Sequence, residues 1–248
     1  MSAIYILWLR ELKKYTRSRV QIVASLGQPL LYLLVLGFGF GPVFQKAGGG
    51  SYLQFVAPGV IGMVVLFTSV FSGIALLWDR QFGFLKETLV APVPRILIMI
   101  GRTLGGATVA VLQGVVVFGI CLTVGFRTPS LPLLPLAFTF MILTAVLFTA
   151  VGTAIASVLP DFQGFQLVMN FLVMPIFFLS GALFPLTNVP RAMLIIASLD
   201  PLSYSVDGLR FALIGVTHFG VVLDLAILSA VTAAVLILGG YLFSKIQI

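Results

Sequence analysis

The longest polar interruption in this apolar chain runs from Trp78 to Arg95 and reads WDRQFGFLKETLVAPVPR. Its charged residues are Asp79, Arg80, Lys86, Glu87 and Arg95. An aspartate at the start of a helix accepts hydrogen bonds from the unpaired N–H groups there, so Asp79 is predicted to cap a helix. Pro92 and Pro94 cannot continue that helix, because proline lacks the amide hydrogen and its ring clashes with the preceding turn. The stretch therefore predicts a short amphipathic helix that ends sharply.

The apolar side of this predicted helix offers a surface for contact with something outside the chain. On a helical wheel, Phe82, Leu85 and Leu89 share one face, and the charged residues occupy the rest. Such a face either lies among lipid headgroups as a linker or fills a groove on a soluble partner. The residues alone leave both uses open.

Other residue types that carry chemistry are sparse and dispersed. His218 is the only histidine and Cys121 is the only cysteine. A lipid-modifying membrane enzyme would need clustered histidines or carboxylates, and an ion-driven transporter would favour an ionisable residue deep within a span. Neither pattern is visible, since the aspartates outside the 78–95 stretch stand apart, at Asp161, Asp200, Asp207 and Asp224. No Gly-Lys-Ser/Thr motif occurs either, so ATP hydrolysis is not encoded here.

The elements that position these residues are predicted to be membrane helices. Of the 248 residues, 60% are hydrophobic and 8% are charged, whereas about a quarter of a soluble domain is charged. A membrane-spanning helix needs about 20 mostly apolar residues. The chain therefore predicts a single all-α integral membrane domain over residues 1–248. Its six predicted spans are 21–41, 55–77, 97–124, 134–158, 165–184 and 222–244.

Lysine and arginine set the expected orientation, because they gather in cytoplasmic segments. If the N-terminus is inside, the inner side holds ten of them: Arg10, Lys13, Lys14, Arg17, Arg19, Arg80, Lys86, Arg95, Arg102 and Lys245. The outer side then holds four: Lys46, Arg127, Arg191 and Arg210. This distribution predicts that both termini and the 78–95 segment are cytoplasmic.

Residues 1–19 are predicted to form a different kind of helix. One side gathers apolar and aromatic residues, which are Ile4, Tyr5, Trp8, Leu9, Leu12 and Tyr15. The other side gathers the basic residues Arg10, Lys13, Lys14 and Arg17. An aromatic-rich face opposite a basic face is typical of a helix that lies in the membrane interface. A charged segment that only sets the topology is the alternative.

Residues 185–216 are apolar enough to span a membrane, but they are interrupted. Their prolines and charged residues are Pro190, Arg191, Asp200, Pro201, Asp207 and Arg210. Two half-helices, 189–199 and 202–215, that form a re-entrant hairpin in the outer leaflet fit this pattern, with a plain surface loop as the alternative. Asp207 and Arg210 are three residues apart, so they are expected to face one another.

Two stretches resemble type-2 ABC exporter permeases, the group that includes daunorubicin-type drug-efflux permeases. FGFLKETLVAPVPR resembles the cytoplasmic signature of that family, and FLSGALFPLTNVPRAMLIIASLDPLSYSVDGLR resembles its region after the fifth span. Asp200 stands where the family commonly has Asn. The resemblance covers the whole chain, with the amphipathic N-terminus, the six spans and both motifs in the expected order.

The resemblance implies a transport subunit, not an enzyme, that pairs with a second copy of itself and with two ATP-binding ABC subunits. ATP and magnesium would bind to those subunits, and this chain would bind no cofactor, metal or nucleic acid. The segment after the second span would be the coupling helix that contacts the ATP-binding subunit. Its residues are Asp79, Arg80, Phe82, Gly83, Leu85, Lys86, Glu87, Leu89, Pro92, Pro94 and Arg95. The outer hairpin would lie near the exit of the transport path, with Pro190, Arg191, Asp200, Pro201, Asp207 and Arg210.

The substrate is read only coarsely from the composition of the spans. They are rich in Phe, Leu, Val and small residues and carry few fixed charges. Such walls favour a hydrophobic drug-like or lipid-like substrate that is moved outward across the cell membrane. Polysaccharide and lipid-linked glycan exporters share the fold, so that alternative stays open.

Overall fold

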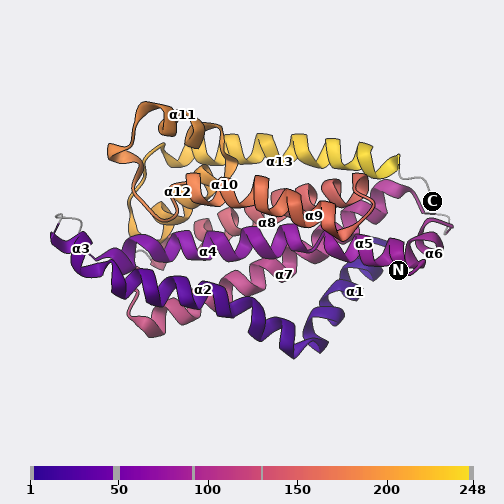
Figure 1. Ribbon diagram of the computed structural model, residues 1–248, viewed down its shortest axis with the longest axis horizontal. Coiled ribbons are helices and arrows are strands. Elements are labelled where there is room, and N and C mark those ends of the chain that lie inside the picture. The colour runs from indigo at the N-terminus through magenta and orange to yellow at the C-terminus, as the bar shows by residue number, and fades with distance from the viewer. Residues whose placement is uncertain (1–2, 47–50, 91–92, 130, 246–248) are drawn as a thin grey trace.

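The structure is a computed structural model that describes residues 3–46, 51–90, 93–129 and 131–245. These residues form helices and no strands, and the long helices run side by side in an elongated bundle (Figure 1). The long helices are α2 (Arg19–Gly39), α4 (Tyr52–Phe71), α7 (Arg95–Val124), α8 (Leu134–Val158) and α13 (Val221–Ser244). The predicted all-α membrane fold is confirmed.

Two of the predicted spans are built from consecutive helices. After α4 the chain makes one turn and continues through α5 (Ile74–Gln81). The fifth span consists of α9 (Phe162–Val168), the π-helical turn η2 (Met169–Val173) and α10 (Met174–Leu179). The structure thus follows the expected order of spans along the chain.

Five stretches in the described part of the chain are long and apolar enough to cross a membrane. They are Tyr52–Gln81, Arg95–Val124, Leu131–Val158, Phe162–Leu179 and Val221–Ser244. The predicted first span corresponds to α2, whose described apolar stretch, Ser25–Gly39, is shorter than these. The predicted count of six is therefore approximate.

The centre of the bundle is α4, which packs against α2, α7, α8 and α12 (Pro201–Ile214). Glycines let the backbones approach where the α4–α5 turn meets α8. A Cβ atom on Gly73 would lie 2.3 Å from the carbonyl oxygen of Gly152, and one on Gly152 would lie 2.4 Å from the carbonyl oxygen of Val70. Small residues serve this purpose in membrane bundles, where packing replaces the hydrophobic driving force. This close contact fixes the α5 end of the second span against α8.

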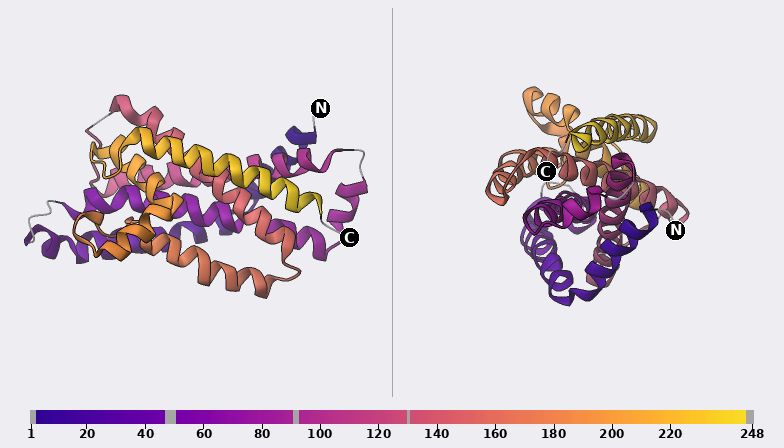
Figure 2. Two further views of the ribbon diagram at one scale, coloured as in Figure 1. Left: turned by 90° about the horizontal axis from the view of Figure 1, so that it is seen from above. Right: turned by 90° about the vertical axis from the view of Figure 1, so that its right-hand side faces the viewer.

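The short helices divide between the two ends of the bundle. The beginning of α1 (Ala3–Arg17), the end of α13 and α6 (Phe84–Val90) lie at one end, here called the α6 end (Figures 1 and 2). The opposite end, here called the α11 end, holds α3 (Gly41–Lys46) and α11 (Arg191–Leu199). The remaining short elements are the 3-10 turns η1 (Leu131–Leu133) and η3 (Leu186–Asn188). The predicted cytoplasmic segment and the predicted outer hairpin thus lie at opposite ends.

The N-terminal helix α1 packs along α7. A Cβ atom on Gly101 would lie 3.0 Å from the Cβ atom of Leu7, so the two helices are in close contact. Further along, Trp8 Nε1 donates a hydrogen bond to Thr108 Oγ1 at 3.0 Å. The predicted helix is present, and its position in the membrane interface stays a prediction.

Candidate functional site

The 78–95 segment is two helices joined by a sharp turn. α5 ends at Gln81, Gly83 has φ +82°, and α6 begins at Phe84. A side chain at Gly83 would be strained because L-residues rarely adopt positive φ, which is why glycine suits this turn. The prediction of one short helix across the segment is wrong, since the turn at Gly83 divides it.

Asp79 holds three helices together at the start of this segment. Its Oδ1 accepts a hydrogen bond from Arg10 Nη2 of α1 at 2.6 Å, and its Oδ2 is paired with Arg102 Nη2 of α7. Asp79 and Arg102 are both buried, so the pairing compensates charges that are removed from water. The prediction that Asp79 caps a helix is wrong, because the residue lies inside α5 and binds two guanidinium groups.

Two other predicted coupling residues, Arg80 and Arg95, bind the ends of neighbouring helices. Arg80 donates to the carbonyl oxygens of Leu159 at 3.0 Å and Ser157 at 3.2 Å, at the end of α8. Arg95 donates to the carbonyl oxygen of Ser244 at 2.6 Å, at the end of α13. The last carbonyls of a helix have no partner within it, so these arginines satisfy groups that need one. The segment is thereby fixed to four other helices of the bundle.

Part of the α6 end is an exposed surface that carries two phenylalanine rings and a glutamate. We call it the α6 surface, and it consists of Phe82 (62% exposed), Phe84 (54%), Val90 (83%) and Glu87. The ring of Phe82 stacks on that of Trp78, with centroids 5.3 Å apart and planes 3° from parallel. Phe82 is thus held in place, although most of its ring is open to a partner.

The exposed surface differs from the predicted one. Leu85 is 2% exposed and belongs to the core, so the prediction that it shares an exposed face with Phe82 is wrong. The side chains of Lys86 and Leu89, and all of Pro92, lie outside the described residues. Pro94 directly precedes α7. The proline that was predicted to end the preceding helix therefore also marks the start of the next one.

At the α11 end, the predicted half-helices are present as α11 and α12. Pro190 and the exposed Arg191 stand where α11 begins. Asp200 caps α12, because its Oδ1 accepts from the backbone N–H of Leu202 at 2.9 Å, and Pro201 occupies the first helical position. α12 is packed among α4, α8 and α13, which disagrees with a plain loop on the surface.

Asp207 and Arg210 have separate partners. Asp207 accepts from Thr217 Oγ1 and from the backbone N–H groups of His218 and Phe219, each at 2.8 Å from Oδ2. Arg210 donates to the carbonyl oxygen of Gly181 at 3.0 Å and lies over the ring of Phe55, 4.1 Å from its centroid. In the described part of the chain no ion pair joins the two, so the expectation that they face one another did not extend to a direct contact between their charged groups.

Sequence reasoning missed the burial of two charged residues. Arg102 was predicted only as one of the basic residues of the inner side, and in the structure it lies within the bundle and pairs with Asp79 across 23 positions of sequence. Asp224, in the first turn of α13, is fully buried, and neither carboxylate oxygen has a hydrogen-bond partner in the described part of the chain. Local spacing carries no signal for either, because both environments come from helices distant in sequence. Among the described residues, no three His, Cys, Asp or Glu side chains are placed to hold a metal ion.

The bundle, with five stretches in its described part that are long and apolar enough to cross a membrane, defines a multi-pass α-helical membrane protein. A family model described as ABC-2 type transporter matches residues 2–214, and the chain belongs to that family. It is 31% identical over 232 residues to the inner membrane transport permease YadH of Escherichia coli (strain K12), covering 88% of each chain. It is 29% identical over 213 residues to nodulation protein J of Rhizobium leguminosarum bv. trifolii, covering 84% of this chain and 80% of that one.

Family membership establishes the general role of the chain. It is a multi-pass membrane transport subunit and not an enzyme. The family implies partnership with ATP-binding ABC subunits.

Proposed function

We propose that this chain is the permease half of an ATP-driven exporter in the cell membrane. Two copies and two ATP-binding ABC subunits form the working unit, and ATP and magnesium bind to the latter. Both termini are cytoplasmic, and a hydrophobic drug-like or lipid-like substrate moves from the cytoplasmic side outward. The α6 surface is the contact through which the ATP-binding subunit drives the bundle.

The observation that carries this proposal is the combination of exposure and anchoring at the α6 end. Phe82 and Phe84 are large apolar side chains open to solvent, and buried aromatic anchors contribute most of the binding energy in many interfaces. Behind them, Asp79 and Arg80 bind α1, α7 and α8. A displacement of α6 would therefore move several helices together as a rigid group.

A second copy is supported by polar groups on the fifth span. Gln166 and Asn170 are exposed on α9 and η2, and the Nε2 atom of Gln166 lies 3.4 Å from Oδ1 of Asn170. Polar side chains within membrane segments usually face protein or a water-filled path rather than lipid. A second copy packed near this face would cover the two amides and place a path between the copies.

The test of the proposed function is ATP turnover by the reconstituted complex. The chain is reconstituted in liposomes with its ATP-binding ABC subunit, and hydrophobic drugs, phospholipids and lipid-linked glycans are compared as stimulants. Stimulation by a drug or lipid together with its ATP-dependent movement supports the proposal. Stimulation by glycans alone contradicts the proposed substrate class. If neither the permease nor any compound changes the ATP turnover of the ATP-binding subunit, the proposed role as a permease subunit is contradicted.

The orientation has its own test at Gln81, an exposed residue at the end of α5. We predict that Gln81→Cys, made in a Cys121→Ala background, reacts with a membrane-impermeant thiol reagent only in inverted vesicles. Cys121 is the only cysteine in the sequence, so its replacement leaves the introduced thiol as the only one in the variant. Labelling of this cysteine from outside whole cells would contradict the proposed orientation and support the opposite one.

A further inference from the structure

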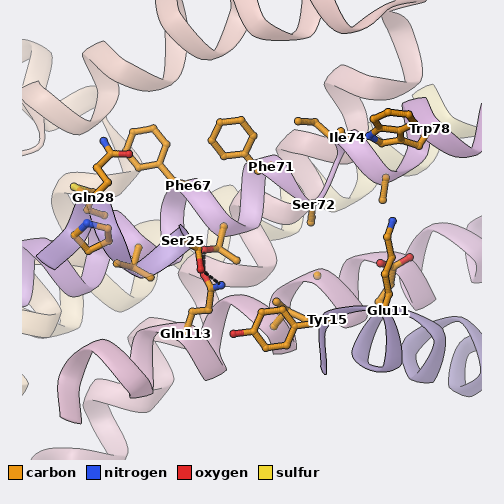
Figure 3. A pocket seen from close by; sticks show the side chains of 18 residues that line it. Glu11, Tyr15, Ser25, Gln28, Phe67, Phe71, Ser72, Ile74, Trp78 and Gln113 are labelled. Atoms are coloured by element: carbon orange, nitrogen blue, oxygen red, sulfur yellow. Dashed lines mark hydrogen bonds between the residues drawn. The ribbon is translucent and has the colours of Figure 1, made fainter. Parts of the chain in front are cut away.

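A cavity of about 500 Å³ lies inside the corner between α1 and α2. Figure 1 shows this corner projecting away from the other helices, and Figure 3 shows side chains from α1, α2, α4, α5 and α7 surrounding the cavity. Its volume is within the range of about 300–1,000 Å³ that is typical of ligand pockets. None of the four residues of the α6 surface lines it, so the cavity is a separate feature of the molecule.

The long wall of the cavity is apolar and aromatic. Met63, Phe67 and Phe71 of α4 line it. Figure 3 shows Phe67 and Phe71 in a row along α4, with Trp78 continuing the wall on α5. Residues 63 and 78 are 15 positions apart, which at 1.5 Å per residue is about 22 Å along the helices. One leaflet contributes about 15 Å of hydrocarbon plus its headgroup layer. The cavity therefore extends over roughly the depth of one leaflet.

Three of the polar side chains at the far end of the cavity bind one another, and Gln28 of α2 also lines this end. Gln113 of α7 donates to Ser25 Oγ of α2 at 2.6 Å, as Figure 3 shows, and its Oε1 accepts from Thr68 of α4. This network joins the three helices. It leaves the space beside Phe67 and Phe71 as a predominantly apolar slot.

The end of the cavity nearer α5 carries one charge of each sign. Glu11 and Lys14 are three residues apart on α1, and both line the cavity. The stem of Glu11 rests against α7, where a Cβ atom on Gly105 would lie 2.8 Å from the Glu11 Cβ atom. Among the described residues, neither Glu11 nor Lys14 forms an ion pair, whereas the neighbouring Arg10 is bound to Asp79. A ligand that matches this end must offer both a cation and an anion.

We propose that this cavity binds a zwitterionic phospholipid from the leaflet at the α6 end. The ammonium group lies beside Glu11, the phosphate lies beside Lys14, and one acyl chain lies along Phe67 and Phe71. An anionic lipid would leave the Glu11 carboxylate without a counter-charge, and a simple organic cation would leave Lys14 without one. The bound lipid supports the α1–α2 corner, whichever substrate the permease exports.

The experiment counts the lipids that the purified chain retains. The protein is equilibrated in detergent micelles that contain equal amounts of phosphatidylethanolamine and phosphatidylglycerol, and retained lipids are identified by native mass spectrometry. We expect one phosphatidylethanolamine to be retained in preference to phosphatidylglycerol. Glu11→Gln should remove this preference, and Lys14→Gln should lower the retention of both lipids.

A matched pair of substitutions on α7 locates the binding site. Val109 lines the cavity, and Val116, seven residues further on, is 43% exposed on the outside of the bundle. Val109→Trp should abolish retention by filling the slot, while Val116→Trp should retain the lipid. Retention by Val109→Trp equal to that of the unmodified chain would overturn the proposed site. If Val109→Trp fails to fold, the lipid preference decides. The headgroup assignment is contradicted if the unmodified chain retains the two lipids equally. It is also contradicted if Glu11→Gln still prefers phosphatidylethanolamine.

Discussion

The two ends of the bundle look alike in sequence and differ in structure. Each has a short helix with prolines near it in sequence, after α6 and on both sides of α11, and each carries charges of both signs. At the α11 end, Asp207 and Arg210 are buried and bind groups of the same chain. At the α6 end, Asp79 and Arg80 bind the bundle in the same way, but Phe82 and Phe84 remain exposed beside them. α11 also exposes apolar side chains, at Ile195, Ile196 and Leu199, but these are aliphatic, whereas the α6 end exposes two phenylalanine rings. Charge with proline therefore marks fixation at both ends, and exposed aromatic rings, which anchor many interfaces, distinguish the α6 end.

The largest effect should come from breaking the fixation at the α6 end. Asp79→Leu leaves Arg102 as a buried charge without a partner, which we expect to destabilise the chain by about 3–5 kcal/mol. Combining it with Arg102→Leu should restore part of that loss, since no buried charge remains. Thermal unfolding of the purified variants in detergent measures both. Equal midpoints for the single variant and the unmodified chain would mean that the buried pairing does not fix this end.

The next comparison sets one carboxylate from each end side by side. Asp207→Ala removes a buried carboxylate that accepts from the N–H groups of His218 and Phe219, and a hydrogen bond to a charged group contributes about 1.5–3 kcal/mol. Glu87→Gln changes an exposed side chain, for which changes within about 0.5 kcal/mol are usual. The same unfolding measurement should therefore separate the two variants. If Glu87→Gln destabilises the chain as much as Asp207→Ala does, the distinction between a charge that holds the bundle together and an exposed charge is lost.

A smaller effect is expected at the turn between α5 and α6. Gly83→Ala forces an L-residue to positive φ at a cost of about 1–2 kcal/mol. The space itself is open, because no atom lies within 4 Å of a Cβ atom placed there. Gly27→Ala, in a helix with similar open space and ordinary φ, is the control. Gly83→Ala should thus lower the unfolding midpoint more than Gly27→Ala, and equal midpoints would show that the turn does not need glycine.

The local sequence pattern was sufficient to predict where the long helices and the two half-helices lie along the chain. The predicted fourth span, 134–158, coincides with α8, and the half-helices are displaced by one or two residues at most. Apolar length and proline position determine such elements, and both are visible in a single segment. The order of elements and the all-α class were therefore predictable.

The contacts of the charged residues were not predictable, because they depend on distant segments. Asp79 is 69 positions from Arg10, and Arg210 is 29 positions from Gly181. The helical wheel misplaced Leu85 for a related reason. Positive φ at Gly83 ends one helix, so residues on its two sides do not share a face. A glycine within a charged amphipathic segment was the available signal for that break.

The central claim is that the α6 surface binds the ATP-binding ABC subunit, and a pull-down of that subunit tests it most directly. Phe82→Ala and Phe84→Ala together remove the two exposed aromatic rings, and an aromatic anchor is worth about 2 kcal/mol or more, or about thirtyfold in Kd. Phe138→Ala on α8, which removes another partly exposed ring, is the control for folding and insertion. We predict that the double variant inserts normally and loses the ATP-binding subunit, while Phe138→Ala retains it. Undiminished capture by the well-inserted double variant would contradict the account.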